Sequence, residues 1–283
     1  MDFVFKFIQY KKMKKIFCSL TFVTAMFINA QTQIIAHRGF WNTQPKTSEN
    51  SIKALENAQR LKIYGSEFDV RMTKDGILVI NHDEHHGKME ISETDFSDLR
   101  KLKLSNGEKL PTLKDYLKQG KKEASVKLII EIKPTKSKER ENEIVTKVLK
   151  TVKELGLDSQ SDYISFSLNI CKEIKKQNPS AKVQYLEGNL SPQQIKAEGL
   201  DGLDYHYSVF EKNPTWISEA NSLGLITNSW TVNDIKVYEA LKNQGINFIT
   251  TNFPDQLKII STYQPFQSFK FYQYWFKLVC FGV

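Results

Sequence analysis

Most of the residues that could do chemistry in this 283-residue chain lie between positions 37 and 83. Two apolar runs in this stretch end in a histidine, His37 and His82, and a third contains Glu67 and Asp69 two positions apart. Side chains two apart on a β-strand share one face, so we expect both carboxylates to point the same way. Carboxylates this close repel each other unless a cation lies between them, so the spacing predicts a site for a hard metal ion.

The turn that follows the two carboxylates predicts where His82 lies. Residues 73–76 read TKDG between two extended segments, and an Asp-Gly pair in that position is a hairpin signal. If the turn centres near Asp75, the antiparallel partner of Asp69 is residue 81 or 82. The hairpin therefore brings His82 back beside the carboxylates.

Further along the chain, short apolar strands alternate with amphipathic helices. This pattern predicts an α/β fold, a TIM-type (β/α)8 barrel of parallel strands, with a β-hairpin and a small insertion after the second strand. Glycines in YGSEF, LGLDS, EGLDG, LGLIT and QGINF are expected to end the preceding helices in a left-handed conformation. The eight expected strands are 34–37, 67–71, 127–133, 163–167, 182–186, 202–206, 225–230 and 247–251, and the hairpin's return strand is 77–81.

The insertion spans about residues 84–111 and is polar and rich in charge. In a barrel enzyme an insertion at this point lies over the active face, where it can shape substrate choice. Thr112 is expected to cap the helix that follows it. His85 and His86 are adjacent in a polar segment, which favours solvated side chains over metal ligands.

Barrel enzymes place their working residues at the C-terminal ends of the strands. Three carboxylates at those ends, Glu67, Asp69 and Glu131, make an oxygen-rich site that suits Ca²⁺ or Mg²⁺ better than zinc. A purely structural network of ion pairs is the alternative, but it does not explain two histidines at the same rim. The residues at strand ends are His37 on the first strand, Glu67 and Asp69 on the second, Glu131 and Lys133 on the third, and Trp230 on the seventh.

The motifs HRG, EFDV followed by TKDG, HD and EIK occur in this order, and over residues 33–258 the chain resembles the glycerophosphodiester phosphodiesterase family. The resemblance implies His37 and His82 as the catalytic pair with Arg38 beside them. It also implies Glu67, Asp69 and Glu131 as ligands of a divalent cation, with His82 allowed to contact the metal. The implied reaction is metal-dependent hydrolysis of glycerophosphodiesters to glycerol 3-phosphate and an alcohol, with a small-molecule substrate as the partner.

The family usually has Pro-Glu-Asn-Thr where this chain has Ser-Glu-Asn-Ser at residues 48–51. Ser48 is expected to cap a helix there, which places Glu49 in the first helical turn, where a carboxylate suits the helix dipole as well as it suits the substrate. Trp230 resembles the family's substrate-pocket tryptophan and could pack on a glycerol or head-group carbon face, or simply in the core. Phe166 and His206 are also expected near the barrel mouth.

Each charged candidate has a role in displacement at a phosphodiester. His37 and His82 could flank the phosphorus as acid and base, although the sequence does not assign which is which. Arg38 could clamp the phosphate through two hydrogen bonds or pair with the carboxylates, and Lys133 could add a point charge to the same phosphate. The alternatives are a phospholipase D-like hydrolase of lysophospholipids or sphingomyelin, and a barrel that binds a phosphorylated head group without turning it over.

Both ends of the chain differ from the barrel. Lysines before the apolar run 16–30 predict a signal peptide over residues 1–30, and hence export to the periplasm or the outside of the cell, with an uncleaved anchor as the competing interpretation and Met13 as an alternative start. This leader carries five lysines and one aspartate, so the net charge falls from +8 to +4 on cleavage, too mild to suggest nucleic acid. The barrel domain is expected over 31–260. The aromatic tail, 261–283, allows weak contact with a membrane surface or an unpacked extension.

Overall fold

Eight apolar segments form the parallel strands that the sequence pattern predicts. The computed structural model describes residues 31–262, and within that range the strand ends lie within about two residues of the expected positions. The strands are β1 (Gln33–Ala36), β2 (Gly65–Met72), β6 (Lys127–Ile132), β7 (Ser161–Ser165), β8 (Val183–Tyr185), β9 (Gly202–His206), β10 (Ile226–Trp230) and β11 (Phe248–Thr251).

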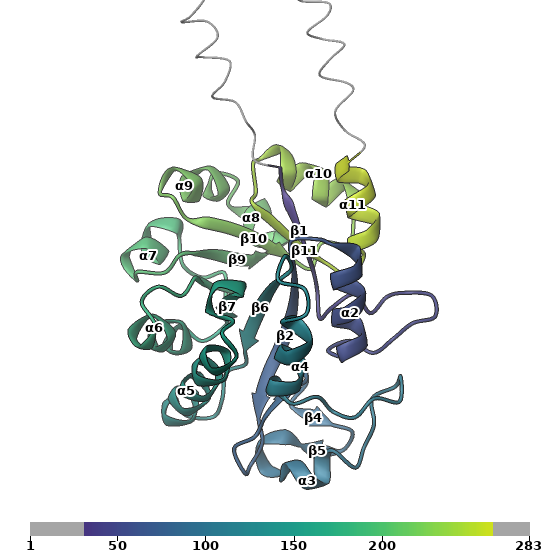
Figure 1. Ribbon diagram of the computed structural model, residues 1–283. Coiled ribbons are helices and arrows are strands. Elements are labelled where there is room, and N and C mark those ends of the chain that lie inside the picture. The colour runs from purple at the N-terminus through teal and green to yellow at the C-terminus, as the bar shows by residue number, and fades with distance from the viewer. Residues whose placement is uncertain (1–30, 263–283) are drawn as a thin grey trace, which may run out of the picture. The chain divides into compact units, whose positions relative to one another are not determined.

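These strands close into a barrel. They are hydrogen-bonded in the order β1, β11, β10, β9, β8, β7, β6, β2, and β1 also pairs with β2, which joins the two edges (Figure 1). All of these pairings are parallel. The predicted TIM-type barrel is confirmed.

The hairpin after β2 is also as predicted. Strand β3 (Leu78–Ile80) runs antiparallel to β2, with Val70 opposite Ile80. The next step along the hairpin is a hydrogen bond from the Asn81 amide to the Asp69 carbonyl, 3.0 Å long. His82 is therefore the residue that leaves the hairpin beside the carboxylates.

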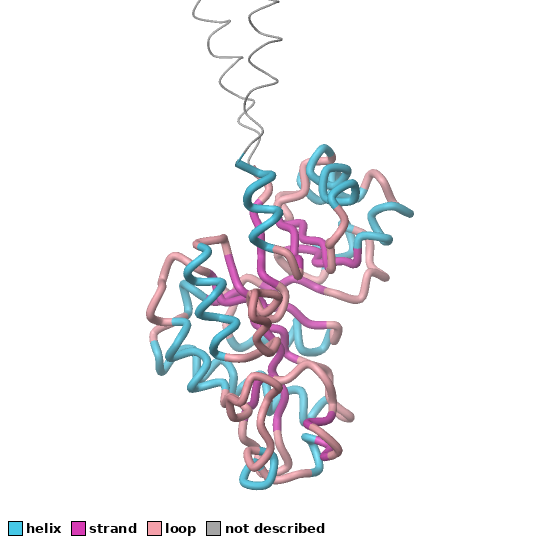
Figure 2. Tube along the Cα trace, turned by 90° about the vertical axis from the view of Figure 1, so that its right-hand side faces the viewer, coloured by secondary structure: helices cyan, strands magenta, loops and turns pink. Residues whose placement is uncertain are grey.

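Helices surround the strands in both views of the chain (Figures 1 and 2). Their buried faces pack on the outside of the barrel, as where Tyr116 meets Phe68 with ring centroids 4.4 Å apart. The helices are α2 (Ile52–Leu61), α3 (Phe96–Leu99), α4 (Leu113–Gly120), α5 (Lys138–Leu155), α6 (Leu168–Gln177), α7 (Pro192–Ala197), α8 (Tyr207–Lys212), α9 (Trp216–Ser222), α10 (Ile235–Asn243) and α11 (Pro254–Thr262), with 3₁₀ turns at Ile91–Glu93 and Asp158–Gln160.

Four of the five expected helix-ending glycines adopt the left-handed conformation: Gly156, Gly199, Gly224 and Gly245. The prediction for Gly65 was wrong, because this glycine lies inside β2 and Lys62 provides the left-handed end of α2. Gly65 has a packing reason instead. A Cβ atom there would lie 3.2 Å from the Lys127 carbonyl oxygen on the neighbouring strand.

The start of α2 also corrects the sequence-based prediction. Ser51 is the N-cap, and its hydroxyl accepts a hydrogen bond from the Ala54 amide at 3.0 Å. Ser48 instead hydrogen-bonds the hydroxyl of Ser105 in the insertion, 2.6 Å away. Glu49 therefore precedes the helix and does not lie in its first turn. The predicted cap at Thr112 is confirmed, because its hydroxyl accepts from the Asp115 amide.

The insertion contains two short strands, β4 (His85–His86) and β5 (Met89–Glu90), the first 3₁₀ turn and α3. It has a small apolar core of its own, formed by Val79, Ile91, Leu99 and Leu110. His85 is exposed as expected, but His86 is only 7 % exposed because β4 turns its second side chain inward.

The closing helix begins at Pro254 as expected and continues to Thr262, two residues past the expected end of the barrel domain. No helix within residues 31–262 is long and apolar enough to cross a membrane. The expected signal peptide, and all but the first two residues of the aromatic tail, lie outside the described residues.

Candidate active site

Three carboxylates meet at the C-terminal rim of the barrel. Glu67 and Asp69 project from β2, and Glu131 lies on β6 directly opposite Asp69 in the strand register. All three side chains are buried, and one oxygen from each lies within 4.8 Å of the others. Strand alternation and parallel register thus bring together the three residues that the sequence singled out.

The hydrogen bonds of the cluster leave negative charge uncompensated. Glu67 Oε2 accepts from the Arg38 amide at 2.7 Å, while Glu67 Oε1 is buried and has no hydrogen-bond partner within residues 31–262. The Lys133 ammonium lies 2.8 Å from Asp69 Oδ1 and 2.6 Å from Glu131 Oε1. Lys133 therefore pairs with Asp69 and Glu131, whereas Glu67 keeps one oxygen without a partner within residues 31–262.

The acidities of these groups reflect the same imbalance. Burial, and next the negative charge of Asp69, raise the pKa of Glu67 well above its ordinary value and that of Glu131 to about 7. Burial also acts to raise the pKa of Asp69, but the charges of Lys133 and His82 and the hydrogen bonds from Lys133 and Asn50 together outweigh it and hold this pKa low. Three oxygen donors with an unpaired buried oxygen fit a hard divalent cation such as Ca²⁺ or Mg²⁺.

His37 follows β1 and faces the same rim. Its Nδ1 lies 2.7 Å from Asn252 Oδ1, and because that amide oxygen accepts, Nδ1 carries the proton and Nε2 remains free. Burial, and next the positive charge of Arg38, lower the pKa of His37 to about 4. The imidazole is therefore neutral at neutral pH, the form that can take up a proton.

His82 reaches the rim from the hairpin. Its Nδ1 lies 2.8 Å from the Asp83 carboxylate, and its carbonyl accepts from Arg71 Nε at 2.9 Å. His82 and His37 both line a cavity of about 190 Å³, together with Arg38, Glu67, Glu131 and Lys133 on the polar side. Two histidines from distant parts of the chain therefore face one small space beside the carboxylates.

Arg38 adopts a left-handed backbone conformation with φ 56°, which is uncommon for a residue with a side chain. This conformation directs its amide at Glu67, and its guanidinium lies 2.9 Å from Glu49 and 3.7 Å from Asp69. The following Gly39 has φ 80°, and a Cβ atom there would lie 2.7 Å from the Ala54 side chain of α2. Arg38 thus forms ion pairs with carboxylates, which is one of its two expected roles. It also lines the cavity, where the other expected role, clamping a phosphate, would place it.

The apolar side of the cavity includes Trp230 and Phe166, whose rings meet edge to face at 5.5 Å. The Trp230 indole donates to the Asp204 carbonyl at 2.9 Å. His206 packs against the Trp230 ring, and its own Nδ1 bonds Ser208, so it supports the tryptophan without lining the cavity.

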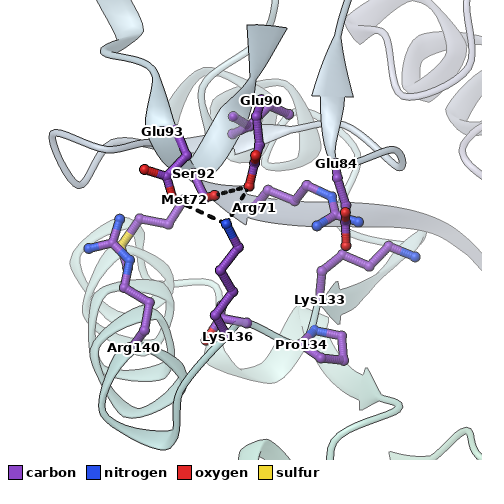
Figure 3. A pocket seen from close by; sticks show the side chains of 12 residues that line it. Arg71, Met72, Glu84, Glu90, Ser92, Glu93, Lys133, Pro134, Lys136 and Arg140 are labelled. Carbon is purple, nitrogen blue, oxygen red and sulfur yellow. Dashed lines mark hydrogen bonds and ion pairs between the residues drawn. The ribbon is translucent and has the colours of Figure 1, made fainter.

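Two further pockets adjoin this cavity. Glu49 lines one of about 550 Å³ that also contains His82, and it does not line the central cavity. Lys133 lies at the boundary with the other, which measures about 400 Å³ and separates the insertion from the loop after β6 (Figure 3). In that pocket Lys136 pairs with Glu90 and Glu93. Each of these two pockets therefore shares a residue with the central cavity that the sequence had singled out, His82 in the first and Lys133 in the second.

Three residues of the site were missed in the sequence. Asn50 Nδ2 donates to Asp69 Oδ2 at 2.7 Å, and Asn50 Oδ1 accepts from the Asp69 backbone amide. Asn252 holds His37, and Asp204 lies in the cavity wall. Asn252 follows the last barrel strand, so the rule that places working residues at strand ends could have found it. Asn50 stands where the family motif also has asparagine, so the resemblance could have found it. Asp204 carried no signal apart from its charge within an expected strand.

A comparison with known proteins agrees with this fold and shows the family of the chain. Residues 37–256 match the model of the glycerophosphoryl diester phosphodiesterase family, and the chain belongs to that family. A crystal structure of a glycerophosphodiester phosphodiesterase from Parabacteroides distasonis is 42 % identical with a TM-score of 0.81, covering 82 % of this chain and 98 % of that one. The protein is accordingly an enzyme of phosphodiester hydrolysis.

Two other relatives are more distant. A glycerophosphodiester phosphodiesterase of Caldanaerobacter subterraneus subsp. tengcongensis is 28 % identical over 80 % of this chain and 96 % of its own length. An Oleispira antarctica phosphodiesterase, solved with the product sn-glycerol-3-phosphate, is 23 % identical with a TM-score of 0.71 and covers 81 % of this chain and 96 % of that one. At this level of identity, the likeness to the Oleispira antarctica structure shows only that the two proteins share a fold.

Proposed function

We propose that this protein hydrolyses glycerophosphodiesters to glycerol 3-phosphate and an alcohol with a bound divalent cation and two histidines as acid and base. One observation carries the proposal: three buried carboxylates lie within 4.8 Å of one another, and two of them, Glu67 and Glu131, line the same cavity as His37 and His82. Neither a structural ion cluster nor a binding barrel requires two histidines beside such a group.

The histidines divide the proton transfers. His37 is neutral with Nε2 free, so it takes a proton from the attacking water as the oxygen bonds to phosphorus. His82, oriented by Asp83, gives a proton to the alcohol oxygen as the bond between that oxygen and phosphorus breaks. Arg38 and Lys133 contribute positive charge at the same rim, where they orient the phosphate oxygens.

Glu67, Asp69 and Glu131 are the residues that would hold the cation, and Asn50 fixes the orientation of Asp69. The cation supplies neutralisation of the charge that gathers on the phosphate oxygens. We infer Ca²⁺ or Mg²⁺, because every donor is a carboxylate oxygen.

A release assay tests this function directly. Purified protein is incubated with glycerophosphocholine, glycerophosphoethanolamine, glycerophosphoglycerol, lysophosphatidylcholine and sphingomyelin, with and without EDTA. We expect glycerol 3-phosphate from the first three, loss of release with EDTA, and recovery when Ca²⁺ or Mg²⁺ is added. Release that survives exhaustive chelation would contradict the metal, and choline release from the two lipids alone would favour a phospholipase D-like activity.

We also propose export of the mature protein and weak contact of its aromatic tail with membranes. The lysines and apolar run of residues 1–30 support export, and the nine aromatic residues and two lysines among residues 261–283 support the contact. Deleting residues 263–283, which leaves α11 intact, should reduce sedimentation with anionic vesicles and leave turnover of soluble substrates unchanged. A matched full-length protein serves as the control, and equal sedimentation of the two would contradict the contact.

A further inference from the structure

The proposed acid-base chemistry makes no use of Asp204, although this residue lines the same cavity. Asp204 lies on β9, is 1 % exposed, and its Oδ1 has no hydrogen-bond partner within residues 31–262. Barrel interiors are normally filled by branched apolar side chains, and a buried carboxyl oxygen without a partner is costly. Asp204 therefore presents an unsatisfied acceptor to the cavity.

The neighbours of Asp204 hold the carboxyl in place without satisfying that oxygen. The Asn228 side chain on β10 hydrogen-bonds the Asp204 carboxyl, and Asn228 Nδ2 donates to the Thr250 hydroxyl on β11 at 3.0 Å. The Asp204 carbonyl already accepts from Trp230. Two residues of β10 thus hold Asp204, and its free oxygen is a fixed feature of the cavity wall.

Strand order places Asp204 across the barrel from the metal candidates. Around the closed sheet β9 is four strands from β2, which carries Glu67 and Asp69, so the two strands face each other. Glu131 and Lys133 line the cavity on the side of β6, and next to them, on the side of β7 and β8, the cavity wall is apolar and consists of Ile164, Phe166 and Leu186. A ligand whose phosphate lies at the charged rim would extend its carbon chain along these side chains toward Asp204.

We propose that Asp204 accepts a hydrogen bond from a free hydroxyl of the substrate's glycerol moiety, so that the site selects diesters of unacylated glycerol. This inference deepens the function proposed above and rests on it. The cavity measures about 190 Å³, which suits a glycerol-sized group. A carboxyl group can accept from a hydroxyl whether it is ionised or protonated, and esterification of that hydroxyl removes the donor.

The test compares two substrates that differ only in the glycerol hydroxyls: glycerophosphocholine and propyl phosphocholine. In Asp204→Leu we expect kcat/KM for glycerophosphocholine to fall by about 10- to 100-fold, mainly through KM, because the hydroxyl loses its acceptor. Turnover of propyl phosphocholine should stay within about twofold of wild type. Asp204→Asn keeps an acceptor oxygen and should recover most of the loss.

Asp162→Asn is the matched control. Asp162 is another buried aspartate on a barrel strand, but it does not line the cavity, so this change should leave the ratio of the two substrates unaltered. If Asp204→Leu does not fold, the same comparison is made with Asp204→Ala, which removes the acceptor without adding bulk, by measuring inhibition by glycerol 3-phosphate and by propyl phosphate. Asp204→Ala should then weaken the first inhibitor and leave the second unchanged.

Three results would overturn the inference. The first is an equal loss for both substrates in Asp204→Leu, and the second is no loss for either substrate in that variant. The third is a higher metal requirement in Asp204→Asn, which would assign the residue to the metal site. By contrast, a wild-type enzyme that releases nothing from any glycerophosphodiester would refute the proposed function itself.

Discussion

Both ends of the barrel contain buried charged side chains, but the two ends differ in whether those side chains have partners. At the N-terminal end Asp162 is bonded by the Tyr64 hydroxyl at 3.4 Å, and Lys127 lies 3.9 Å from it at the protein surface. At the C-terminal end one buried lysine pairs with two of the three carboxylates, and an oxygen of Glu67 has no partner within residues 31–262. One end is satisfied by its own side chains, and the other is left to be completed by a ligand.

This difference separates stability from function within one fold. The Asp162 carboxylate has both a hydrogen bond and a counter-ion, so its arrangement needs no ligand to explain it. A cluster with excess negative charge persists only when another interaction compensates for it, and such clusters mark functional sites. The predictions below test whether the two ends divide in this way, beginning with the largest expected effect.

Removing either histidine at the C-terminal end should nearly abolish turnover. For His37→Ala and His82→Ala we expect kcat to fall by about 10²-fold or more, because each change removes one proton transfer. Thermal unfolding and metal titration should be close to wild type. Steady-state release of glycerol 3-phosphate measures the effect, and near-normal turnover in either variant would rule out the two-histidine mechanism.

The carboxylates should control metal affinity. In Glu67→Gln, Asp69→Asn and Glu131→Gln we expect the metal concentration for half-maximal activity to rise by about 10-fold or more, since each variant loses a charged oxygen ligand. Metal titration after treatment with EDTA gives the value. An unchanged requirement in all three would mean that the cluster is a network of ion pairs.

The low pKa of His37 predicts a pH dependence of stability in the metal-free protein. The unfolded chain takes up a proton near pH 6.5, but folded His37 does so only near pH 4, so protonation favours unfolding between these values. This contribution is fully present above pH 6.5 and is lost as the pH falls toward 4. Urea unfolding in EDTA at pH 7, 6, 5 and 4 should show a shallower decline in His37→Gln, and parallel curves would contradict it.

At the N-terminal end, Asp162→Asn should have the smallest effect on activity. We expect kcat/KM within about twofold of wild type and a loss of about 1 kcal/mol in the free energy of unfolding, the typical worth of one hydrogen bond. Activity assays and urea unfolding provide the two readings. A large loss of activity with normal stability would show that the two ends do not divide the work as described.

The strands and the carboxylate cluster could be read from the sequence because both depend on short-range periodicity. Eight apolar runs separated by amphipathic helices leave few ways to bury the apolar surface other than a parallel barrel. Glu67 and Asp69 share a face by alternation alone, and the Asp-Gly turn returns the chain to His82. The errors at Ser48 and Gly65 arose where several residues of suitable type compete for one local role.

Only the tertiary structure decided which residues, far apart in the sequence, lie beside His37 and around the cavity. Asn252 lies 215 positions from His37, yet it sets the tautomer of that ring, and no local pattern links the two. Closure of the barrel also places Asp204 across from β2, because the strand order in space determines which side chains share the interior. The sequence by itself determined the strands, the rim residues and the carboxylate cluster, since these follow from local spacing. Their partners depended on contacts that form only when the eight strands close into a barrel.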